Sequence, residues 1–582
     1  MSRCTSTRAG RVALDGVQLF YEGLEQPVDD IRGELSFTGH GLEAEHLDAR
    51  FSDLVLNARI EARPKSAGLV VVEFPFAPKA TGGGVSDYIP GFVRGQLTGE
   101  SRWRAELPLD GSDAGLVLSS DLRGTAVQLP PPMGKLASET APIRLSFGSD
   151  SAPLRIRLDY GQRLGADIAY AREGQALKPR AAQLKLGGGM PAAPAADARG
   201  MVVSGELPEM DIGLWAGLLS TSGDGAADAG GLALREVDLS ATRWLLDDSI
   251  IPASRLRWSP TPEGWRADLS GDGAEGELRY ARAGQLNARL KRLSLQSRPP
   301  PAIAAGVTPE GPARDPREWP VLDIDCQRLL AGELELGHLQ LRSSRVSDGQ
   351  RLDKLSISGG KLDLDASGIW QRNAAGSSAA LKFELGSSDA AGVLQALGYS
   401  PTLTAQSSKF NGELNWTPAP RLNWQQASGS IRLDVEKGTL KAVEPGAGRV
   451  LGLLNLYAIP RRLLLDFRDV ASAGLGFDKL AGNFQLGEGQ ARTSDMELSS
   501  PSLRMEIRGR IGLVARDLDQ QVKVYPDMSS GVTLGAALLG GPAVGALVLV
   551  AQQVLDKPIE QVTQLSYRVT GGWDNPRVDR GN

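Results

Sequence analysis

Histidine and cysteine, the side chains that most often bind metals or act as nucleophiles, are scarce in this chain. Its 582 residues include three histidines, His40, His46 and His338, and two cysteines, Cys4 and Cys326. No HExxH or HxxxH spacing occurs, and two cysteines make neither a disulfide framework nor a zinc site. The sequence therefore predicts no metal site, no cofactor and no histidine-dependent catalysis.

The motifs that support acyl transfer or nucleotide chemistry are missing from the sequence as well. It contains no GxSxG, no GxxxxGK[ST] and no GxGxxG that opens a helix after a strand. We interpret the glycine triplets at residues 82–84 and 187–189 as loops rather than phosphate cradles. Folding could bring two of the many carboxylates together, but no spacing indicates such a pair. We therefore expect a protein that is not an enzyme.

Composition narrows the choice of partners. Lys and Arg total 64 against 69 Asp and Glu, which gives a net charge of -5 and a pI of about 5.6. The basic residues are scattered among acidic ones and form no stripe, so nucleic acid is not expected to bind. Aromatic residues make up only 5% of the chain, which argues against a carbohydrate-binding or adhesive β-solenoid with exposed aromatic platforms.

One stretch of the sequence stands apart because it carries no charge. Residues 528–555 read MSSGVTLGAALLGGPAVGALVLVAQQVL, long enough to cross a bilayer but interrupted by Gly540, Gly541 and Pro542, which weaken a helix. We expect two short apolar helices over 528–556, as a hairpin or lying in a membrane interface. A buried helical cap is the alternative. The candidates for membrane contact are Leu534, Leu538, Leu539, Val544, Leu547, Leu549 and Val550.

The elements that fill most of the chain are short amphipathic strands. Apolar and polar residues alternate over five to eight positions and then meet Gly, Asp or Asn, and a period of two places apolar side chains on one face of a strand. Helical periodicity is rare and weak, at residues 211–219, 388–397 and 449–456. We expect a mainly β, elongated and curved antiparallel sheet with few short helices.

Composition also suggests how the strands are grouped. We expect β segments over residues 1–186, 232–296 and 318–527, and a closing strand and tail over 557–582. Residues 187–231, rich in Gly, Pro and Ala and holding one short helix, and the Pro-rich residues 297–317 are interpreted as flexible connections or mobile loops.

A sheet with one apolar face must cover that face. A sandwich or a closed barrel does so with its own strands, and an array of sandwiches remains one interpretation of the alternation. An open sheet with an apolar concave side would need a ligand. Acyl chains would suit it, because burying each CH₂ is favourable by about 0.8 kcal/mol. The candidates for lining such a groove are Leu54, Leu56, Ile60, Leu355, Ile357, Leu362, Leu364, Ile431, Leu433 and Val435.

Several motifs, taken in order, resemble one known family. Residues 445–456 read PGAGRVLGLLNL, residues 459–469 read IPRRLLLDFRD, and GFD follows at 476–478. The closing YRVTGGWDNP at 567–576, LPPPMGK at 129–135, LGHL at 336–339 and LGY at 397–399 also stand in the expected order. Together they resemble the C-terminal region of the YhdP branch of AsmA-like bacterial envelope proteins, over nearly the whole chain.

The resemblance implies a bridge-like transporter whose β-sheet gutter crosses the periplasm and conducts phospholipids between the inner and outer membranes. It also implies an N-terminal anchor in the inner membrane and a C-terminal end that faces the outer membrane. This sequence lacks the anchor and begins as if within a domain, without the apolar core of a signal peptide. We therefore expect it to be the C-terminal part of a longer protein.

Two adjacent arginines, Arg461 and Arg462, are candidates for contacting phospholipid headgroups, because guanidinium groups bind phosphate in a bidentate manner. A solvated turn in which they pair with Asp466 or Asp469 is the alternative. For the whole protein, the alternative to lipid transport is a periplasmic scaffold that assists outer-membrane biogenesis without carrying lipid.

Overall fold

The structure is a computed structural model, and its description covers most of the chain between Gly10 and Arg580. The described residues are 10–20, 26–38, 41–62, 68–109, 115–148, 154–215, 232–298, 315–440, 475–526 and 564–580, without 80, 83, 90, 174–175, 247–248, 375, 397–400, 402, 419–422, 502 and 574. The chain divides into two compact units, Met1–Asp247 with Pro252–Gly271, and Asp248–Ile251 with Asp272–Asn582.

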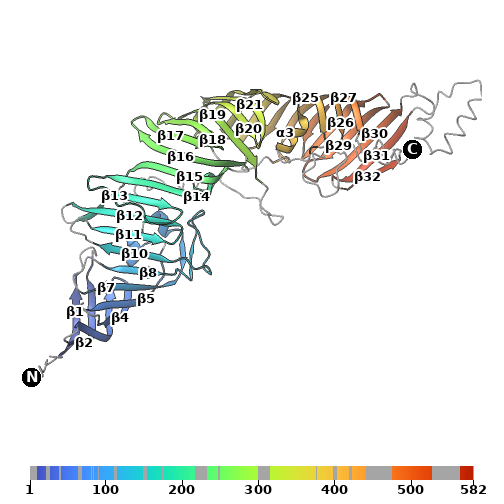
Figure 1. The fold of residues 1–582 in the computed structure, drawn as a ribbon. Coiled ribbons are helices and arrows are strands. Elements are labelled where there is room, and N and C mark those ends of the chain that lie inside the picture. Colours follow the sequence, from blue (N-terminus) through green and yellow to red (C-terminus); the bar gives the residue numbers. More distant parts are fainter. Residues whose placement is uncertain are drawn as a thin grey trace, which may run out of the picture. The chain divides into compact units, whose positions relative to one another are not determined.

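The first unit is built almost entirely of strands (Figure 1). Its elements are β1 (Gly10–Leu19), β2 (Val28–Thr38), β3 (Gly41–Phe51), β4 (Leu54–Glu61), β5 (Leu69–Phe76), η1 (Gly84–Tyr88), α1 (Gly91–Arg94), β6 (Leu97–Gly99), β7 (Ser101–Pro108), β8 (Val117–Ser120), β9 (Thr125–Val127), β10 (Ile143–Gly148), β11 (Arg155–Tyr160), β12 (Leu164–Glu173), β13 (Ala176–Leu186), β14 (Gly200–Asp211), β15 (Leu234–Leu246), β16 (Ser249–Thr261) and β17 (Gly264–Gly271).

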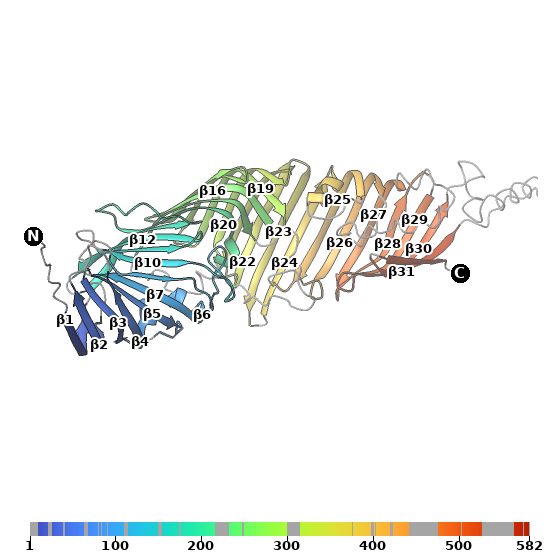
Figure 2. The same cartoon turned by 60° about the horizontal axis from the view of Figure 1, so that its bottom comes forward.

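Within the second unit the strands follow one another side by side in chain order (Figure 2). They are β18 (Ala274–Ala281), β19 (Gln285–Ser297), β20 (Val321–Ala331), β21 (Leu334–Val346), β22 (Gly349–Gly359), β23 (Leu362–Asn373), β24 (Gly376–Ser387), β25 (Leu403–Trp416), β26 (Ser428–Leu440), β27 (Leu475–Gly487), β28 (Gln490–Ser499), β29 (Leu503–Gly512), β30 (Asp517–Pro526), β31 (Leu565–Gly572) and β32 (Asn575–Arg580), with one short helix, α3 (Ala390–Ala396).

Most neighbouring strands are antiparallel, so the predicted mainly β fold is confirmed, but three of the strand pairings among the described residues are parallel. β13 pairs with β14, β14 with β15, and β19 with β20 in parallel. Two parallel neighbouring strands need a connection of about a dozen residues or more, because the chain must return to the end of the sheet at which the first strand began. The Gly- and Pro-rich stretches between these strands supply that length. The alternation of apolar and polar residues cannot predict whether two strands pair in parallel or antiparallel, because it is the same in both kinds of pairing.

Alternating burial along the strands shows why the sequence pattern produces two faces. In β28 the buried residues are Ala491 and Thr493, then Met496 and Leu498. The phase changes at a bulge between Thr493 and Met496, where the register with β29 shifts. A bulge inserts one extra residue and so returns the next apolar side chain to the same face.

The helices that the structure describes are short. α3 lies within the range for which a helix is predicted at 388–397 and begins at a cap, where the Asp389 carboxylate accepts the Gly392 amide at 2.9 Å. Across the described part of the chain, no helix has the length and apolar character needed to span a membrane. The predicted helices at 449–456 and 528–556 lie outside the described residues, as do Cys4 and His40.

Candidate functional site

An apolar row crosses consecutive strands of the second unit. The cross-strand register links Cys326 on β20 to Leu339, then to Ile357, Leu364 and Leu385 on the strands that follow. Directly opposed residues point to the same face of a sheet. Leu329, Ile357 and Leu362 form a buried cluster in this region, and Cys326 is 0% exposed. Leu336, Leu339, Leu364 and Leu385 pack against that cluster and are only partly buried. We call the apolar side of β20–β24 the open face.

A second row crosses the strands nearer the C-terminus. It links Val435 on β26 to Leu480, Leu498, Met505 and Val524. Val435, Leu480 and Leu498 are 0% exposed and belong to a cluster of buried apolar residues that extends to Val569. The backbones of β27 and β28 also approach closely here, since a Cβ on Gly482 would lie 2.7 Å from the Met496 Cα. We call the apolar side of β26–β31 the closed face.

The boundary between these two faces holds α3 and two buried serines. Val393 of α3 packs against the open face, whereas Leu394 packs against the closed face. In the register Ser387 opposes Ser408, and Ser408 opposes Val435. The Ser387 hydroxyl donates to the Lys361 carbonyl at 2.9 Å and accepts from the Asp389 amide at 3.0 Å. The Ser408 hydroxyl is fully buried and has no hydrogen-bond partner in the described structure.

The first unit has an apolar row of its own. Through the register, Leu47 on β3 faces Ala58 on β4, Val72 on β5 and Ala105 on β7. The same row continues through Leu118, Leu145, Leu158, Ala166, Leu184, Val203 and Val237. Ala44, Leu47 and Ala58 are buried at its start, with Leu14, Leu35, Ile60, Val70 and Val72 packed around them half-buried. The unit therefore presents a continuous apolar side.

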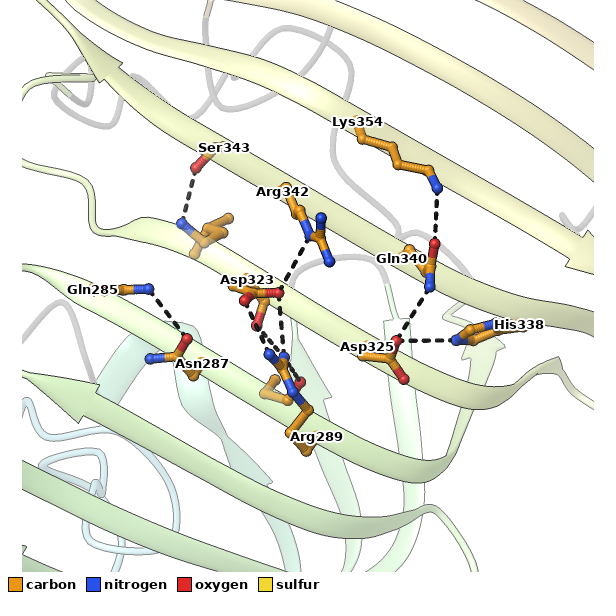
Figure 3. Close-up of polar contacts among 12 residues, drawn as sticks. Gln285, Asn287, Arg289, Asp323, Asp325, His338, Gln340, Arg342, Ser343 and Lys354 are labelled. Carbon is orange, nitrogen blue, oxygen red and sulfur yellow. Dashed lines mark hydrogen bonds and ion pairs between the residues drawn. The ribbon is translucent and has the colours of Figure 1, made fainter.

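The opposite face of the second unit is charged and hydrogen-bonded (Figure 3). Arg289 Nη2 lies 2.9 Å from Asp323 Oδ2, and this guanidinium lowers the pKa of Asp323 below its ordinary value. Asp325 Oδ2 is 3.2 Å from His338 Nε2 and accepts from Gln340 at 3.4 Å. Exposed ion pairs add little stability, about 0–1 kcal/mol each. Their placement keeps this side in water.

One motif of the resemblance, LGHL at 336–339, has a local structural explanation. Gly337 has a φ of 127° beside two register shifts between β20 and β21, and a Cβ there would lie 2.3 Å from the Ser358 carbonyl oxygen. Only glycine fits such a position without strain. The next residue, His338, contacts Asp325 on the polar face.

The predicted groove residues lie on these apolar sides. Ile357 and Leu364 oppose each other on the open face, and Leu355 lies two residues before Ile357. Leu433 and Val435 belong to the closed face, while Leu362 is buried on the open one. Ile60 packs in the first unit, where Leu54 and Leu56 share the alternation of β4. Ile431 is half-buried on β26. Whether these residues line a groove stays a prediction.

The other predicted site residues are not placed. Arg461, Arg462 and the seven membrane-contact candidates lie outside the described residues. Sequence reasoning missed apolar residues of equal standing: Leu339, Leu385, Phe410, Leu480, Leu498 and Met505. The alternation in 475–487, LGFDKLAGNFQLG, was a signal that could have found Leu480.

In the part of the chain that the structure describes, no group of three His, Cys, Asp or Glu residues could hold a metal ion. What the described residues do show is a sheet with apolar side chains on one face and charged side chains on the other. These observations define a class of protein, a mainly β chain whose strands have one apolar side and one charged side.

Comparison with known proteins identifies the family within that class. The model of the YhdP family, described as YhdP protein, matches residues 4–578. The chain therefore belongs to the YhdP family. It is 24% identical over 615 residues to the intermembrane phospholipid transporter YhdP of Escherichia coli (strain K12), a match that covers 98% of this chain and 46% of that relative. The chain thus spans less than half of the relative's length. No solved structure matches.

Proposed function

We propose that this chain carries phospholipids between the inner and outer membranes of a bacterial envelope along the apolar side of its sheet. The observation that carries the proposal is the row Leu339–Ile357–Leu364–Leu385, in which the leucines are only partly buried. Neighbouring strands are about 4.8 Å apart, so an acyl chain lying across them meets an apolar side chain at every strand. The relative's name, intermembrane phospholipid transporter, supports the same ligand.

The two-faced sheet suits transport without chemistry. Each CH₂ moved from water onto the apolar side is stabilised by about 0.8 kcal/mol, and neither a covalent step nor a cofactor is needed. Because the stabilisation depends on area and not on a specific contact, a lipid can shift from strand to strand among similar positions. The charged side, with Arg289, Asp323 and Asp325, stays hydrated.

The setting and the membrane contacts are part of the proposal. The longer protein would be anchored in the inner membrane and would cross the periplasm. The apolar segment 528–556, which carries no charge from Met528 to Leu555, would contact the outer membrane, and Arg461 and Arg462 would contact lipid phosphates. Deleting residues 531–555 should abolish liposome binding and leave the β-strands folded. Undiminished binding would contradict the membrane role of that segment.

Native mass spectrometry with lipid extraction tests the proposal directly. The chain is purified from a bacterial envelope in mild detergent, and we expect several phospholipids of mixed headgroup per molecule. A folded protein without lipid would contradict the proposal and favour a periplasmic scaffold that assists outer-membrane biogenesis.

A further inference from the structure

Residues 122–141 of the first unit make a long excursion between two strands that are direct neighbours. β8 ends at Ser120 and β10 begins at Ile143, yet the two strands pair antiparallel, with Ser120 opposite Ile143. A hairpin connection of two to five residues would suffice for such a pair. The chain instead runs through β9, which pairs with β6, and through the LPPPMGK turn, whose Lys135 bridges back to Val127. We call residues 122–141 the cover.

The cover packs on the apolar side of the sheet. Its Leu122, Met133 and Ala141 are buried together with Tyr160 at the end of β11. Leu164 and Leu186 pack against the same cluster. The register makes Tyr160, Leu164 and Leu186 neighbours on three consecutive strands. The cover therefore occupies the part of the apolar side to which these strands contribute.

Side chains from outside the cover hold it through its backbone carbonyls. The Tyr160 hydroxyl donates to the Met133 carbonyl at 3.2 Å, and Trp215 Nε1 donates to the Pro131 carbonyl at 3.0 Å. Arg163 Nη1 donates to the carbonyls of Pro132, at 3.1 Å, and of Gly134.

Carbonyls in a proline-rich turn need such donors, because each proline removes a backbone N–H that could have paired with a carbonyl. Inside the cover, the buried Lys135 ammonium donates to the carbonyls of Leu122 and Thr125. The closed position is thus defined by directional bonds as well as by apolar packing.

We propose that the cover is a gate on the lipid path, shown closed in this structure and held by Tyr160, Arg163 and Trp215. The inference rests on the proposed function, since a gate needs a path. An acyl chain and the cover cannot both occupy the surface of Leu164 and Leu186. By contrast, Leu14, Ile60 and Val70 on β1–β5 are only half-buried. Lipid in the first unit is therefore kept from the surface of Leu164 and Leu186 until the cover moves away.

A photo-crosslinking experiment tests the gate without altering the reporting positions. The whole chain is incubated with phosphatidylethanolamine and phosphatidylglycerol vesicles that contain a phospholipid with a diazirine in one acyl chain, irradiated, and mapped by peptide mass spectrometry. We expect adducts on peptides containing Ile60 and Leu364, and far fewer on the peptide containing Leu164. The double variant Arg163→Gln with Trp215→Phe removes three hydrogen bonds to the cover. It should raise adducts at Leu164 at least about tenfold, which is the effect of losing a single charge-assisted hydrogen bond.

The matched control is Arg144→Gln, the same exchange on the neighbouring strand β10, at a position opposite Ser119 and Asp159 on the charged side. It should leave every adduct unchanged. Adducts at Leu164 equal to those at Ile60 in the unaltered chain would overturn the gate and keep the path. A folded double variant with no increase, checked by thermal melting, would also overturn it. Adducts at none of the three positions would refute the proposed function itself.

Discussion

The open and closed faces of the second unit are made by the same kind of strand but differ in how fully their side chains are buried. On the open face, Leu364 and Leu385 sit partly exposed beside three buried neighbours. On the closed face, Leu480, Leu498 and Ile507 are 0% exposed and are joined by Met496 and Met505. Methionine fills irregular gaps because it is unbranched and flexible. Alternation predicts an apolar side in both regions, but only packing decides whether that side is a core or a surface.

This difference separates two roles for residues with the same pattern. A fully buried leucine contributes to the stability of the fold, because replacing it with a smaller residue leaves a cavity. Replacing a half-buried leucine on an otherwise similar strand costs less stability, and the exposed part of its side chain can contact a ligand. Of the predicted groove residues, Leu433 and Val435 thus belong with the core, whereas Leu355 and Leu364 are the better reporters of lipid.

The largest effect is expected for Leu498→Asp on the closed face. A carboxylate cannot be buried there without a partner, so we expect a loss of at least about 4 kcal/mol in the free energy of unfolding. Urea denaturation of the whole chain, followed by hydrogen exchange in β27–β30, measures it. A loss under about 1 kcal/mol would show that this face is accessible to water and would contradict the difference between the open and closed faces.

The matched change on the open face, Leu364→Asp, should act on lipid more than on stability. The carboxylate reaches water, so we expect about 1–2 kcal/mol of destabilisation and a clear fall in co-purified phospholipid. Asp365→Asn, on the adjacent residue of the opposite side, is the control and should change neither quantity. Full lipid load in a folded Leu364→Asp protein would remove the open face from the path.

The two serines at the boundary sharpen the comparison at a smaller scale. Ser408→Ala removes a buried hydroxyl without a hydrogen-bond partner, so stability should stay the same or rise by up to about 1 kcal/mol. Ser387→Ala removes a hydroxyl with two bonds and should cost about 1–2 kcal/mol. Both are measured by thermal unfolding. Equal losses would mean that the Ser408 hydroxyl is bonded in solution.

The smallest effect concerns Asp315, which precedes β20, contacts Arg317 and also lies 3.9 Å from Arg372 on β23. The hydrogen bond from Arg317 lowers the pKa of Asp315 to about 2. Its stabilisation is therefore present above the unfolded pKa of 3.8 and disappears as the pH falls through about 2. Asp315→Asn should abolish the part of the acid dependence between those values. An unchanged pH–stability profile would contradict the contact.

Sequence patterns could predict the faces because a period of two fixes which side chains point together. Ile357 and Leu364 each alternate with polar neighbours along their strands, and the register opposes them directly. The depth of burial could not be predicted, since Leu364 and Leu498 have the same local pattern. Nor could the bulge before Met496 or the cover over Leu164, because each depends on contacts between segments that are distant in sequence.

The parallel joint between β19 and β20 also has a consequence for how the chain folds. From β21 to β26 every strand pairs antiparallel with its predecessor, so these contacts form between segments close in sequence. Pairing Leu290 with Cys326 instead requires closing a long loop first, and such contacts form slowly. We expect the antiparallel blocks to assemble early and the parallel joints to close last. Slow, late protection of the β19 and β20 amides in pulsed hydrogen exchange would then mark where one folding block ends and the next begins.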